Sequence, residues 1–495
     1  MIETSIPDTG GWWLRRLATQ LMARHDHYCE LEDYYNNEHL LPSNSSKAVR
    51  LAYQRLMDIS RMCWAEMIVE APRERMSVQG FRTGADSDEG GDKEAWRIWQ
   101  SNTLDADSSL VHRASMTFGC AYVIVGGPDD EVGGAPLITI EDPRQVAVSY
   151  DPKYRRKPRA AIKLYYDEMM GRWAAWLYLP GVVRQAVSGT AGEHWDPQAE
   201  DWQQWNWVGP PAELPATARN LVPVVAFGNQ VDIKGEHWGE FERHTPTIDR
   251  ITYQILQRLE VATLQAFRQR AIQADLPTHD SEGNEIDYND IFAADPGALW
   301  QLPATATLWE SGGVDLNPIL QSVKADVADL AAATRTPLYY VTPDAANGSA
   351  QGASTMKEGL LAKVADRSTQ AGESWEQVIS YAFTILGDTT RASRLDMEVI
   401  WADPAFHSLA ERYDAATKGV TAGVPWRQRM VLLGFSPSAI ERMEAERAAD
   451  ALIASLAAPP TQVATQAPPG APQTPPATPP ATTTPAAQPT PPAAP

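Results

Sequence analysis

The sequence lacks the short patterns that mark common nucleotide-driven and metal-dependent enzymes. The dipeptide Gly-Lys does not occur anywhere, which excludes the usual Walker A phosphate loop of a motor ATPase. GxGxxG, GxSxG and HExxH are also absent. The nearest look-alike is GEHWGE (235–240), which lacks the spacing of helical metal ligands, and we interpret His237 as a loop residue. The patterns therefore predict neither a cofactor nor a metal.

Cysteines and long apolar runs are scarce as well. Cys29, Cys63 and Cys120 form no CxxC pair, which excludes a zinc ribbon or a dithiol redox motif. Because an odd number of cysteines does not suit a disulfide framework, we predict reduced, buried thiols in a cytosolic protein. No run of eighteen apolar residues occurs, and the N-terminus has no cationic start or apolar region. The sequence therefore predicts no membrane span and no secretory signal.

Positive charge is also in short supply. The formal net charge is −21 at pH 7, whereas proteins that grip nucleic acid usually carry a basic surface. The acidity disfavours binding to anionic membranes. It fits a soluble scaffold, or a conduit that must not hold the DNA that it passes. We interpret the 17 tryptophans as core and subunit contacts rather than as sugar-stacking platforms.

The titratable residues offer no obvious reaction centre. The nine histidines are scattered. His25 and His27 lie near acidic residues, but residues two apart do not share a helix face, so we interpret them as a solvated helix end rather than a metal site. Among 63 acidic residues, no pair stands out as the acid and base of a glycosidase.

Hydrophobic spacing predicts a mixed fold that is mainly helical. In the first hundred residues, helices are expected after Asp8, after the SNSS turn (43–46) as far as Glu70, and around Trp96. From about residue 118 to Asn229, short apolar or alternating runs are separated by Gly, Pro and Asp. These runs predict a meander-like antiparallel sheet region.

Two helices with one apolar stripe each flank an acidic insert. The first is expected from Thr245 to about Ala274, a length of about 40 Å. The second follows Pro318 and ends before Pro337. The insert between them (271–315) has no Lys or Arg, and short strands are expected in it at ALWQLP (298–303) and TLWE (307–310). It suits either a solvated loop domain or a collar that presents acid to DNA or to a basic partner. The stripes consist of Ile248, Ile251, Ile255, Leu259 and Ala262, and of Ile319, Val323, Val327 and Leu330.

An uncharged, glycine-rich loop (342–354) comes next. Its composition suits a plain connector, but loops of this length between helices are uncommon and often functional. A long helix is expected from Thr355 to Leu386, and a further helical part at about 405–455. From Ala458 the chain is dominated by Pro, Ala, Thr and Gln, a composition that cannot bury a core and predicts disorder.

Several segments, taken in order, resemble the portal proteins of tailed, siphovirus-type phages in the Gp6-like family. The resemblance is collinear from about residue 10 to residue 390, and the order is more specific than any single segment. Two departures occur: GEHWGEF (235–241) stands where a Ser-Glu pair is common, and NGSAQGAS (347–354) replaces a Ser-Ser-Ala-Asp run. The similar segments are YYNNEHLLP (34–42), AEMIVEAPRERMSVQGFR (65–82), WQSNTLDADSSLVHRASMTFGCAYVIVG (99–126), ITIEDPRQVAVSYDP (138–152), NLVPVVAFGN (220–229), RTPLYYV (335–341) and GASTMKEGLLAKVADRSTQAGESWEQVI (352–379).

The resemblance implies a fold and a domain organisation. The fold is α+β and mainly helical, with the wing, stem, clip and crown regions of a phage portal and a disordered Pro/Ala-rich C-terminal tail. By position, these regions are a wing (1–240), a stem helix (241–274), a clip (275–316), a second stem helix (317–336), a tunnel loop (337–354), the long helix of the wing (355–404), a crown (405–457) and the tail (458–495).

The resemblance also implies a function. Such a protein is no enzyme and needs no cofactor. It forms a ring, expected to be a dodecamer, at the unique capsid vertex, and is the conduit for DNA packaging and ejection. The expected partners are other copies of the chain, the terminase large subunit, head-completion or adaptor proteins, and the major capsid and scaffold proteins. Double-stranded DNA would pass through without sequence specificity, and no membrane is involved. Assembly is expected in the host cytoplasm and residence in the virion.

Charge and position suggest which residues meet these partners. Copies of the acidic clip around a ring would repel phosphate and favour sliding over holding. Cations near the constriction are candidates for transient DNA contact, or equally for salt bridges with Asp326, Asp329, Glu358 and Asp366. The DNA-channel candidates are Lys324, Arg335, Asn347, Gln351, Lys357, Lys363 and Arg367. The candidates for docking the terminase or an adaptor are Asp280, Glu282, Glu285, Asp287, Asp290 and Asp295.

Two alternative functions belong beside this one. Another capsid-vertex or head-morphogenesis structural protein would lack the helix–insert–helix arrangement before a glycine-rich loop. A Trp-rich glycoside hydrolase would be a monomer with carboxylates at strand ends in a cleft, but the sheet region is too small for a barrel of that type.

Overall fold

The computed structural model describes most of the chain, in several stretches. These are residues 2–39, 55–84, 91–191, 201–266, 270–273, 278–279, 282–286, 306–310, 312–341, 350–405 and 407–457. By its internal contacts the chain divides into two units, Met1–Glu441 and Arg442–Pro495. Of the second unit, residues 442–457 are described, and they form the greater part of one helix. The expected disorder of 458–495 concerns residues outside the described part.

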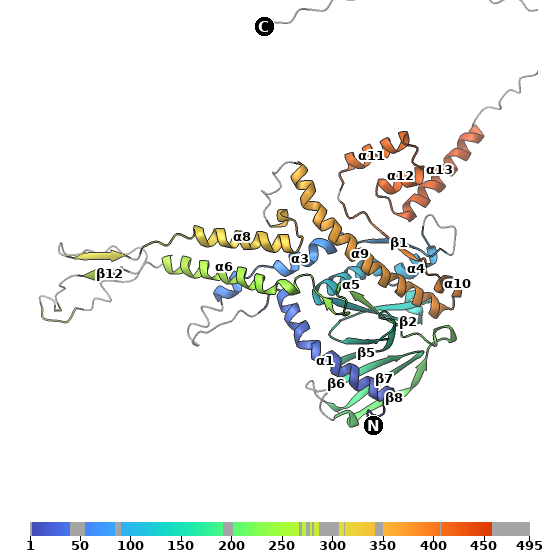
Figure 1. Cartoon of the computed structure of the whole chain (residues 1–495), viewed down its shortest axis with the longest axis horizontal. Helices are drawn as coiled ribbons and strands as arrows, with labels where there is room; N and C mark the ends of the chain where they lie inside the picture. The colour runs from blue at the N-terminus through green and yellow to red at the C-terminus, as the bar shows by residue number, and fades with distance from the viewer. Residues whose placement is uncertain are drawn as a thin grey trace, which may run out of the picture. The chain divides into compact units, whose positions relative to one another are not determined.

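Helices dominate both ends of the described chain and strands its middle, so the expected mixture of helix and strand is confirmed. Figure 1 shows their arrangement. The helices are α1 (Gly10–Tyr35), α3 (Trp64–Arg73), α4 (Lys93–Ser101), α5 (Leu104–Phe118), α6 (Thr245–Ala266), α8 (Asn317–Ala333), α9 (Ala350–Leu386), α10 (Thr389–Ala392), α11 (Leu409–Thr421), α12 (Trp426–Leu432) and α13 (Pro437–Ala457).

Two antiparallel sheets replace the single sheet region expected from the sequence. One is a five-stranded meander of β4 (Val146–Tyr150), β5 (Pro158–Asp167), β6 (Arg172–Leu179), β7 (Val182–Ala191) and β8 (Trp205–Glu213). The other has the order β3-β2-β9, from β2 (Cys120–Asp129), β3 (Ala135–Glu141) and β9 (Val224–Gly228). The meander is therefore confirmed for β4–β8. The last strand instead returns to β2, because an apolar run marks a strand without indicating its partner.

Three short strand pairs complete the sheets; two join distant segments, and β10 with β11 form a local hairpin. They are β1 (Val78–Arg82) with β14 (Glu398–Trp401), β10 (Gln230–Val231) with β11 (His237–Trp238), and β12 (Arg270–Gln273) with β13 (Thr307–Glu310). The strand predicted at TLWE is confirmed as β13. The pairing of β12 shows that the helix expected to reach Ala274 is wrong: α6 ends at Ala266, and Arg270–Gln273 is a strand.

Two further helix boundaries differ from the expectation. Thr9, and not Asp8, caps α1: the Thr9 side chain accepts a hydrogen bond from the Trp12 N–H. Asp8 instead has a φ of 64° and accepts from the indole N–H of Trp13 at 2.9 Å. The helix expected to run to Glu70 is interrupted at 61–63 and begins again as α3, which continues through Pro72.

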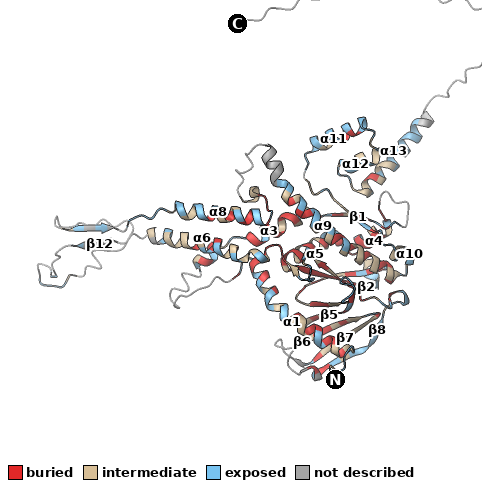
Figure 2. Cartoon of the chain, viewed as in Figure 1, coloured by how far each residue is buried: buried red, intermediate tan, exposed pale blue. Residues whose placement is uncertain are grey.

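The main core lies between the three-stranded sheet and the helices around it. Figure 2 shows buried residues concentrated where α5 and α9 pack on β2 and its neighbours. Trp375 is fully buried at its centre, with its ring centroid 4.8 Å from Trp99 and 4.6 Å from Phe227. Its indole N–H donates to His112 Nε2 at 3.0 Å. A second core joins the first half of α1 to the meander. The interpretation of the tryptophans as core residues is confirmed for those that are buried: Trp13, Trp64, Trp99, Trp202, Trp205 and Trp375.

Helices α6 and α8 pack side by side as a two-helix arm (Figure 1). The Arg250 guanidinium binds both oxygens of Asp326, at 3.0 and 2.9 Å, and the Gln254 amide donates to the same carboxylate at 2.8 Å. The predicted stripes face each other only over part of their length. Ile248, Ile251 and Ile255 are buried, as are Val323, Val327 and Leu330. Farther out, Leu259 and Ile319 are half-buried and Ala262 is exposed.

Candidate functional site

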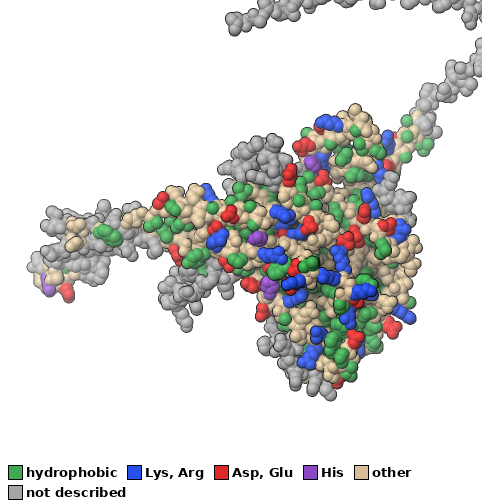
Figure 3. Space-filling view, viewed as in Figure 1, with side chains coloured by type: hydrophobic (Ala, Val, Ile, Leu, Met, Phe, Trp, Pro, Cys, Tyr) green, Lys and Arg blue, Asp and Glu red, His purple; other side chains and the backbone are tan. Residues whose placement is uncertain are grey.

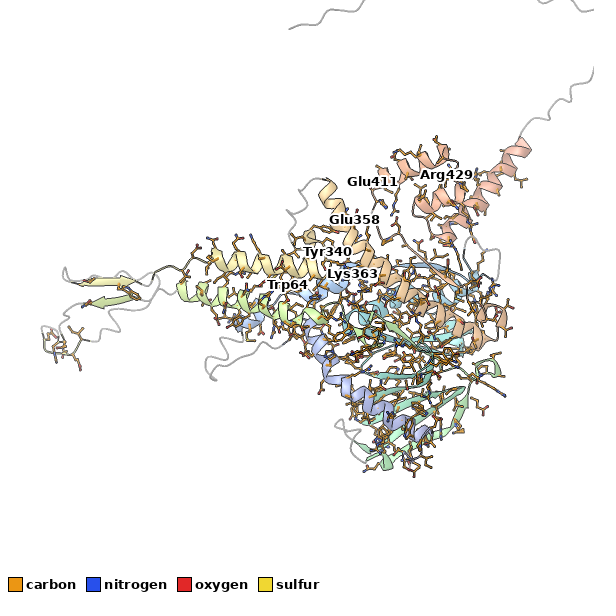
Figure 4. All side chains as sticks on the ribbon, in the orientation of Figure 1. Trp64, Tyr340, Glu358, Lys363, Glu411 and Arg429 are labelled. Atoms are coloured by element: carbon orange, nitrogen blue, oxygen red, sulfur yellow. The ribbon has the colours of Figure 1, made fainter. Side chains whose placement is uncertain are left out.

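The candidate site is the inner end of the arm, called here the arm base, where three distant segments meet. These segments are the loop before α6, the C-terminus of α8 and the middle of α9. Figure 4 shows Lys363, on α9, at this inner end. Helix α6 is initiated there by Thr245 and Pro246, since proline suits the first helical turn. The contacts at the arm base therefore determine how the arm is attached to the rest of the chain.

Glu240 is the centre of the arm base. It is 4% exposed, and its carboxylate lies 2.7 Å from the Nζ of Lys363 and also pairs with Arg367. Its backbone N–H donates to the Met116 carbonyl at the end of α5, at 2.7 Å. The residue before it must be small: a Cβ on Gly239 would lie 2.4 Å from the Thr117 carbonyl oxygen. Glycine therefore allows the chain to approach α5 and bring Glu240 under α9.

Lys363 extends this ion cluster to the arm. It is 3% exposed, and its ammonium also donates to the Thr334 carbonyl at 3.0 Å. Thr334 is the C-cap of α8. A cation at a helix C-terminus is favoured, because unpaired carbonyls give that end a partial negative charge. One lysine thus ties the loop before α6 to the end of α8, and both to α9.

The electrostatics of the cluster favour the charged form of Glu240, whereas burial lowers the pKa of Lys363 although the charge of Glu240 opposes it. Burial alone would raise the pKa of Glu240, but the charges of Lys363 and Arg367 outweigh it and lower the pKa to about 2. Burial, and next the charge of Lys363, lower the pKa of the neighbouring His244. A buried carboxylate held between two cations is expensive to leave unpaired, so the cluster resists separation of its partners.

The end of α8 contains a strained residue. The Thr336 N–H donates to the Ala331 carbonyl and the Arg335 N–H to the Ala332 carbonyl, the paired bonds of a Schellman motif. Such motifs usually have glycine at the left-handed position. Here the residue is Arg335, with a φ of 55° and an exposed side chain. A long side chain at this position costs backbone energy, so its presence points to a use for the guanidinium.

Two further contacts fix α6 against α1. The Tyr34 hydroxyl lies 2.9 Å from both oxygens of Asp249, and the His27 Nε2 lies 2.8 Å from Glu242. The bond to Glu242 raises the pKa of His27 although burial opposes it. His27 lies in the body of α1 and not at its end, but its side chain is 49% exposed, so the expected solvation holds and only the expected position at a helix end is corrected.

A groove lies beside the arm base. Its volume is about 550 Å³, and it is lined by α3, by Arg113 of α5, and by Tyr340 and Val341 just after α8. Figure 4 labels Trp64 and Tyr340, two of its residues. The α3 wall carries Glu66, Glu70 and Glu74, so the groove is acidic on one side. Of the tunnel-loop region predicted at 337–354, residues 342–349 lie outside the described part.

The DNA-channel candidates separate into two groups. Lys324, Arg335 and Lys357 are exposed. Lys363 and Arg367 come together in the ion cluster with Glu240, and Arg367 also pairs with Asp366. Of the salt bridges expected as the alternative, Arg367 forms the one with Asp366, whereas Lys363 is buried against Glu240, which was not among the expected partners. A DNA contact by any of these residues stays a prediction. Asn347 and the side chain of Gln351 lie outside the described residues.

Of the docking candidates in the acidic insert, the structure describes two. Glu282 and Glu285 are exposed, and Glu285 forms an isolated β-bridge with His279. Asp280, Asp287, Asp290 and Asp295 lie outside the described residues, as does the strand predicted at ALWQLP. The docking role stays a prediction.

Sequence reasoning missed Glu240. The segment GEHWGE (235–240) contains Glu240, but the spacing of its residues indicates only that it is not a helical metal site. His237 within that segment lies in strand β11, which corrects its interpretation as a loop residue. The cysteine expectation is also corrected in part, since Cys120 is buried, Cys29 half-buried and Cys63 exposed. No group of three metal-binding side chains and no helix able to cross a membrane occurs in the described residues.

Comparisons with known proteins identify the class of protein that the chain resembles. Residues 14–181 match the family described as "Phage portal protein, SPP1 Gp6-like". Two curated relatives are each described as "Portal protein". That of Mycobacterium phage L5 is 27% identical over 78% of this chain and 78% of its own length. That of Mycobacterium phage D29 is 28% identical over 86% of this chain and 88% of its own length. The predicted resemblance to phage portal proteins is confirmed.

A comparison of structures finds a more distant likeness. A chain from "Neck of native GTA particle computed with C12 symmetry" is 12% identical to this one. The match covers 80% of this chain and 94% of that chain, with a TM-score of 0.40.

Proposed function

We propose that this chain is a portal subunit, which forms a ring at the unique capsid vertex and gives DNA a way in during packaging and out during ejection. The similarity to two portal proteins over most of both chains carries this proposal. The wing, stem, clip and crown are assigned by position, with the arm of α6 and α8 as the stem. The role is structural and not catalytic.

The exposed parts of the arm support ring formation. A ring is a closed assembly in which each subunit offers two different faces to its neighbours. The outer half of the apolar stripes is not covered within one chain: Leu259, Ala262 and Ile319 are at least partly exposed, and Tyr253 is 48% exposed. Arms of adjacent subunits, packed helix on helix, would cover these residues.

The arm base supports a rigid connection between the stem and the rest of the subunit. Glu240, Lys363 and Arg367 join the two arm helices to α9, whose N-terminal end follows the tunnel-loop segment. A movement of the arm would therefore be passed to α9 instead of being absorbed at a soft hinge. This coupling suits a channel whose constriction must respond to events at the clip.

The charge distribution supports a channel that lets DNA slide. Residues 271–315, which make up most of the segment between the arm helices, contain no Lys or Arg, although Arg268 and Arg270 precede them, and a ring would repeat their negative charge around the axis. Phosphates near such a wall are repelled, and counterion release provides no grip. The same acidic clip would dock the terminase, which supplies the energy of translocation, and later the head-completion proteins. Capsid and scaffold proteins would surround the wing.

Mass photometry of the purified full chain, combined with negative-stain images, tests the proposal. The expected result is a ring with a central hole and about a dozen copies, formed alone or after addition of the capsid and scaffold proteins of the same phage. A chain that stays monomeric even with those proteins present would overturn it.

A further inference from the structure

The most concentrated positive charge in the described chain lies on the loop between β4 and β5. Residues 153–157 read KYRRK, in a chain of net charge −21. On the face that Figure 3 shows, basic and acidic side chains are mixed over the body. Lys153, Arg155, Arg156 and Lys157 are all exposed, and Lys234 is exposed on the β10–β11 turn against which this loop packs. We call these five residues the cationic ridge.

The ridge is held in shape by its own backbone. The Asp151 carboxylate accepts hydrogen bonds from the Lys153 and Tyr154 N–H groups at 2.7 and 3.3 Å. The Asp151 N–H donates to the Lys157 carbonyl at 2.9 Å, and the Lys157 N–H to the Tyr154 carbonyl at 2.8 Å. Because the loop is already ordered, binding would cost less conformational entropy than ordering a flexible charged segment.

The two arginines of the ridge are held in place by contacts, while their positively charged groups stay exposed. Arg155 donates to the Ile233 carbonyl, a neutral partner, and keeps its full charge. Arg156 lies 2.8 Å from Glu373 on α9, with both side chains more than half exposed. Such an exposed pair contributes little and is easily exchanged for another anion. Among the described residues, no carboxylate forms a salt bridge with Lys153, Lys157 or Lys234.

The surroundings of the ridge suit a polymer with closely spaced negative charges. Tyr154 is 56% exposed between the cations, with the Lys153 Nζ 5.1 Å from its ring centroid. A hollow of about 640 Å³ lies between the loop, the β10–β11 turn and α9. The loop folds back on itself, so its cations lie close together, and duplex DNA presents about one phosphate charge for every 1.7 Å of its length. A duplex therefore offers several phosphates to the ridge at once, whereas an acidic peptide has to place its carboxylates individually.

We propose that the cationic ridge binds the phosphate backbone of double-stranded DNA without reading its sequence, as a second DNA contact apart from the channel candidates. Glu373, the α9 residue that pairs with Arg156 of the ridge, lies about 15 Å along the helix from Lys363. The inference rests on the proposed function only in naming DNA as the polymer that the assembled protein meets. The ridge holds DNA weakly, while the acidic clip lets it slide.

Fluorescence anisotropy with a labelled 30-base-pair duplex tests the ridge. The full chain is titrated at several salt concentrations, beside the ridge variant Lys153→Ser/Lys157→Ser and the control variant Lys93→Ser/Lys418→Ser. The control removes the same residue type and charge at positions that are 79% and 76% exposed. The expected result is weak, salt-sensitive binding by the unchanged chain and the control. In the ridge variant, the slope of log K against log salt falls by about two.

Three outcomes would overturn the proposal. The first is no duplex binding by the unchanged chain at low salt. The second is an equal salt slope in the ridge and control variants. The third is that the ridge variant loses binding to a labelled poly-glutamate peptide but keeps its binding to the duplex. That result would make the ridge a surface for acidic protein segments. Negative-stain images of each variant keep this result separate from ring formation: intact rings without ridge-dependent DNA binding would refute the ridge alone.

Discussion

Replacing Glu240 with glutamine should destabilise the chain in a way that depends on pH. Burial acts to raise the pKa of Glu240, but Lys363 and Arg367 lower it from the 4.5 of a free glutamate to about 2. At about 1.4 kcal/mol per pKa unit, the shift of Glu240 by itself favours the folded state by about 3 kcal/mol, while the lowered pKa of Lys363 acts in the opposite direction. Removal of one partner of a buried ion cluster typically costs about 3–5 kcal/mol, because the other charges stay buried.

The sign of the pH dependence follows from the lowered pKa. A carboxylate with a depressed folded-state pKa contributes fully above the unfolded-state pKa, and its contribution is lost as pH falls through about 4.5 toward 2. The unchanged chain should therefore lose about 1.4 kcal/mol more than Glu240→Gln between pH 7 and pH 3.5.

Urea unfolding followed by tryptophan fluorescence at both pH values measures this difference. Glu358→Gln is the matched control, since Glu358 is exposed on α9, the helix that carries Lys363, and it should change nothing. The double variant Glu240→Gln/Lys363→Met should recover part of the loss, because it also removes an unpaired buried cation. A Glu240→Gln variant with unchanged stability, or with a loss that is the same at both pH values, would refute the electrostatic account.

Three other substitutions test separate parts of the structure. Arg335→Gly should raise the free energy of unfolding by about 1 kcal/mol because glycine adopts the left-handed position without strain, whereas Arg335→Ala should give no such gain in the same urea experiment. Trp375→Phe should cost about 1–3 kcal/mol in urea unfolding, since it removes the donor to the buried His112 Nε2, and an unchanged midpoint would argue against that bond. Asp326→Asn should speed hydrogen exchange in α8 by weakening the contact with Arg250, with a cost of about 1 kcal/mol. Asp329→Asn on the same helix serves as the control. Equal exchange rates in the two variants would show that packing alone holds the arm.

Local patterns determined the elements but not all of their ends. Pro246 and the spaced isoleucines of α6 are visible in the sequence, and so are the apolar runs that became β4–β8. The end of α6 was missed because Arg270–Gln273 pairs with Thr307–Glu310, far along the chain. Backbone pairing at that separation leaves no signal in a local window.

The sequence by itself determined the class of protein and the charge of its parts. The acidic insert without cations, the two striped helices and the order of the similar segments are all properties of the chain as written. Only the tertiary structure decided which charged side chains are exposed and available to bind a partner. In the sequence, Lys363 and Arg367 suit either a DNA contact or surface salt bridges, whereas folding pairs both of them with Glu240. Lys153 and Lys157, which no sequence pattern marks as candidate binding residues, lie on an ordered and exposed loop. The reason is physical: the energy of a charge depends on its burial and its neighbours, and distant segments supply both.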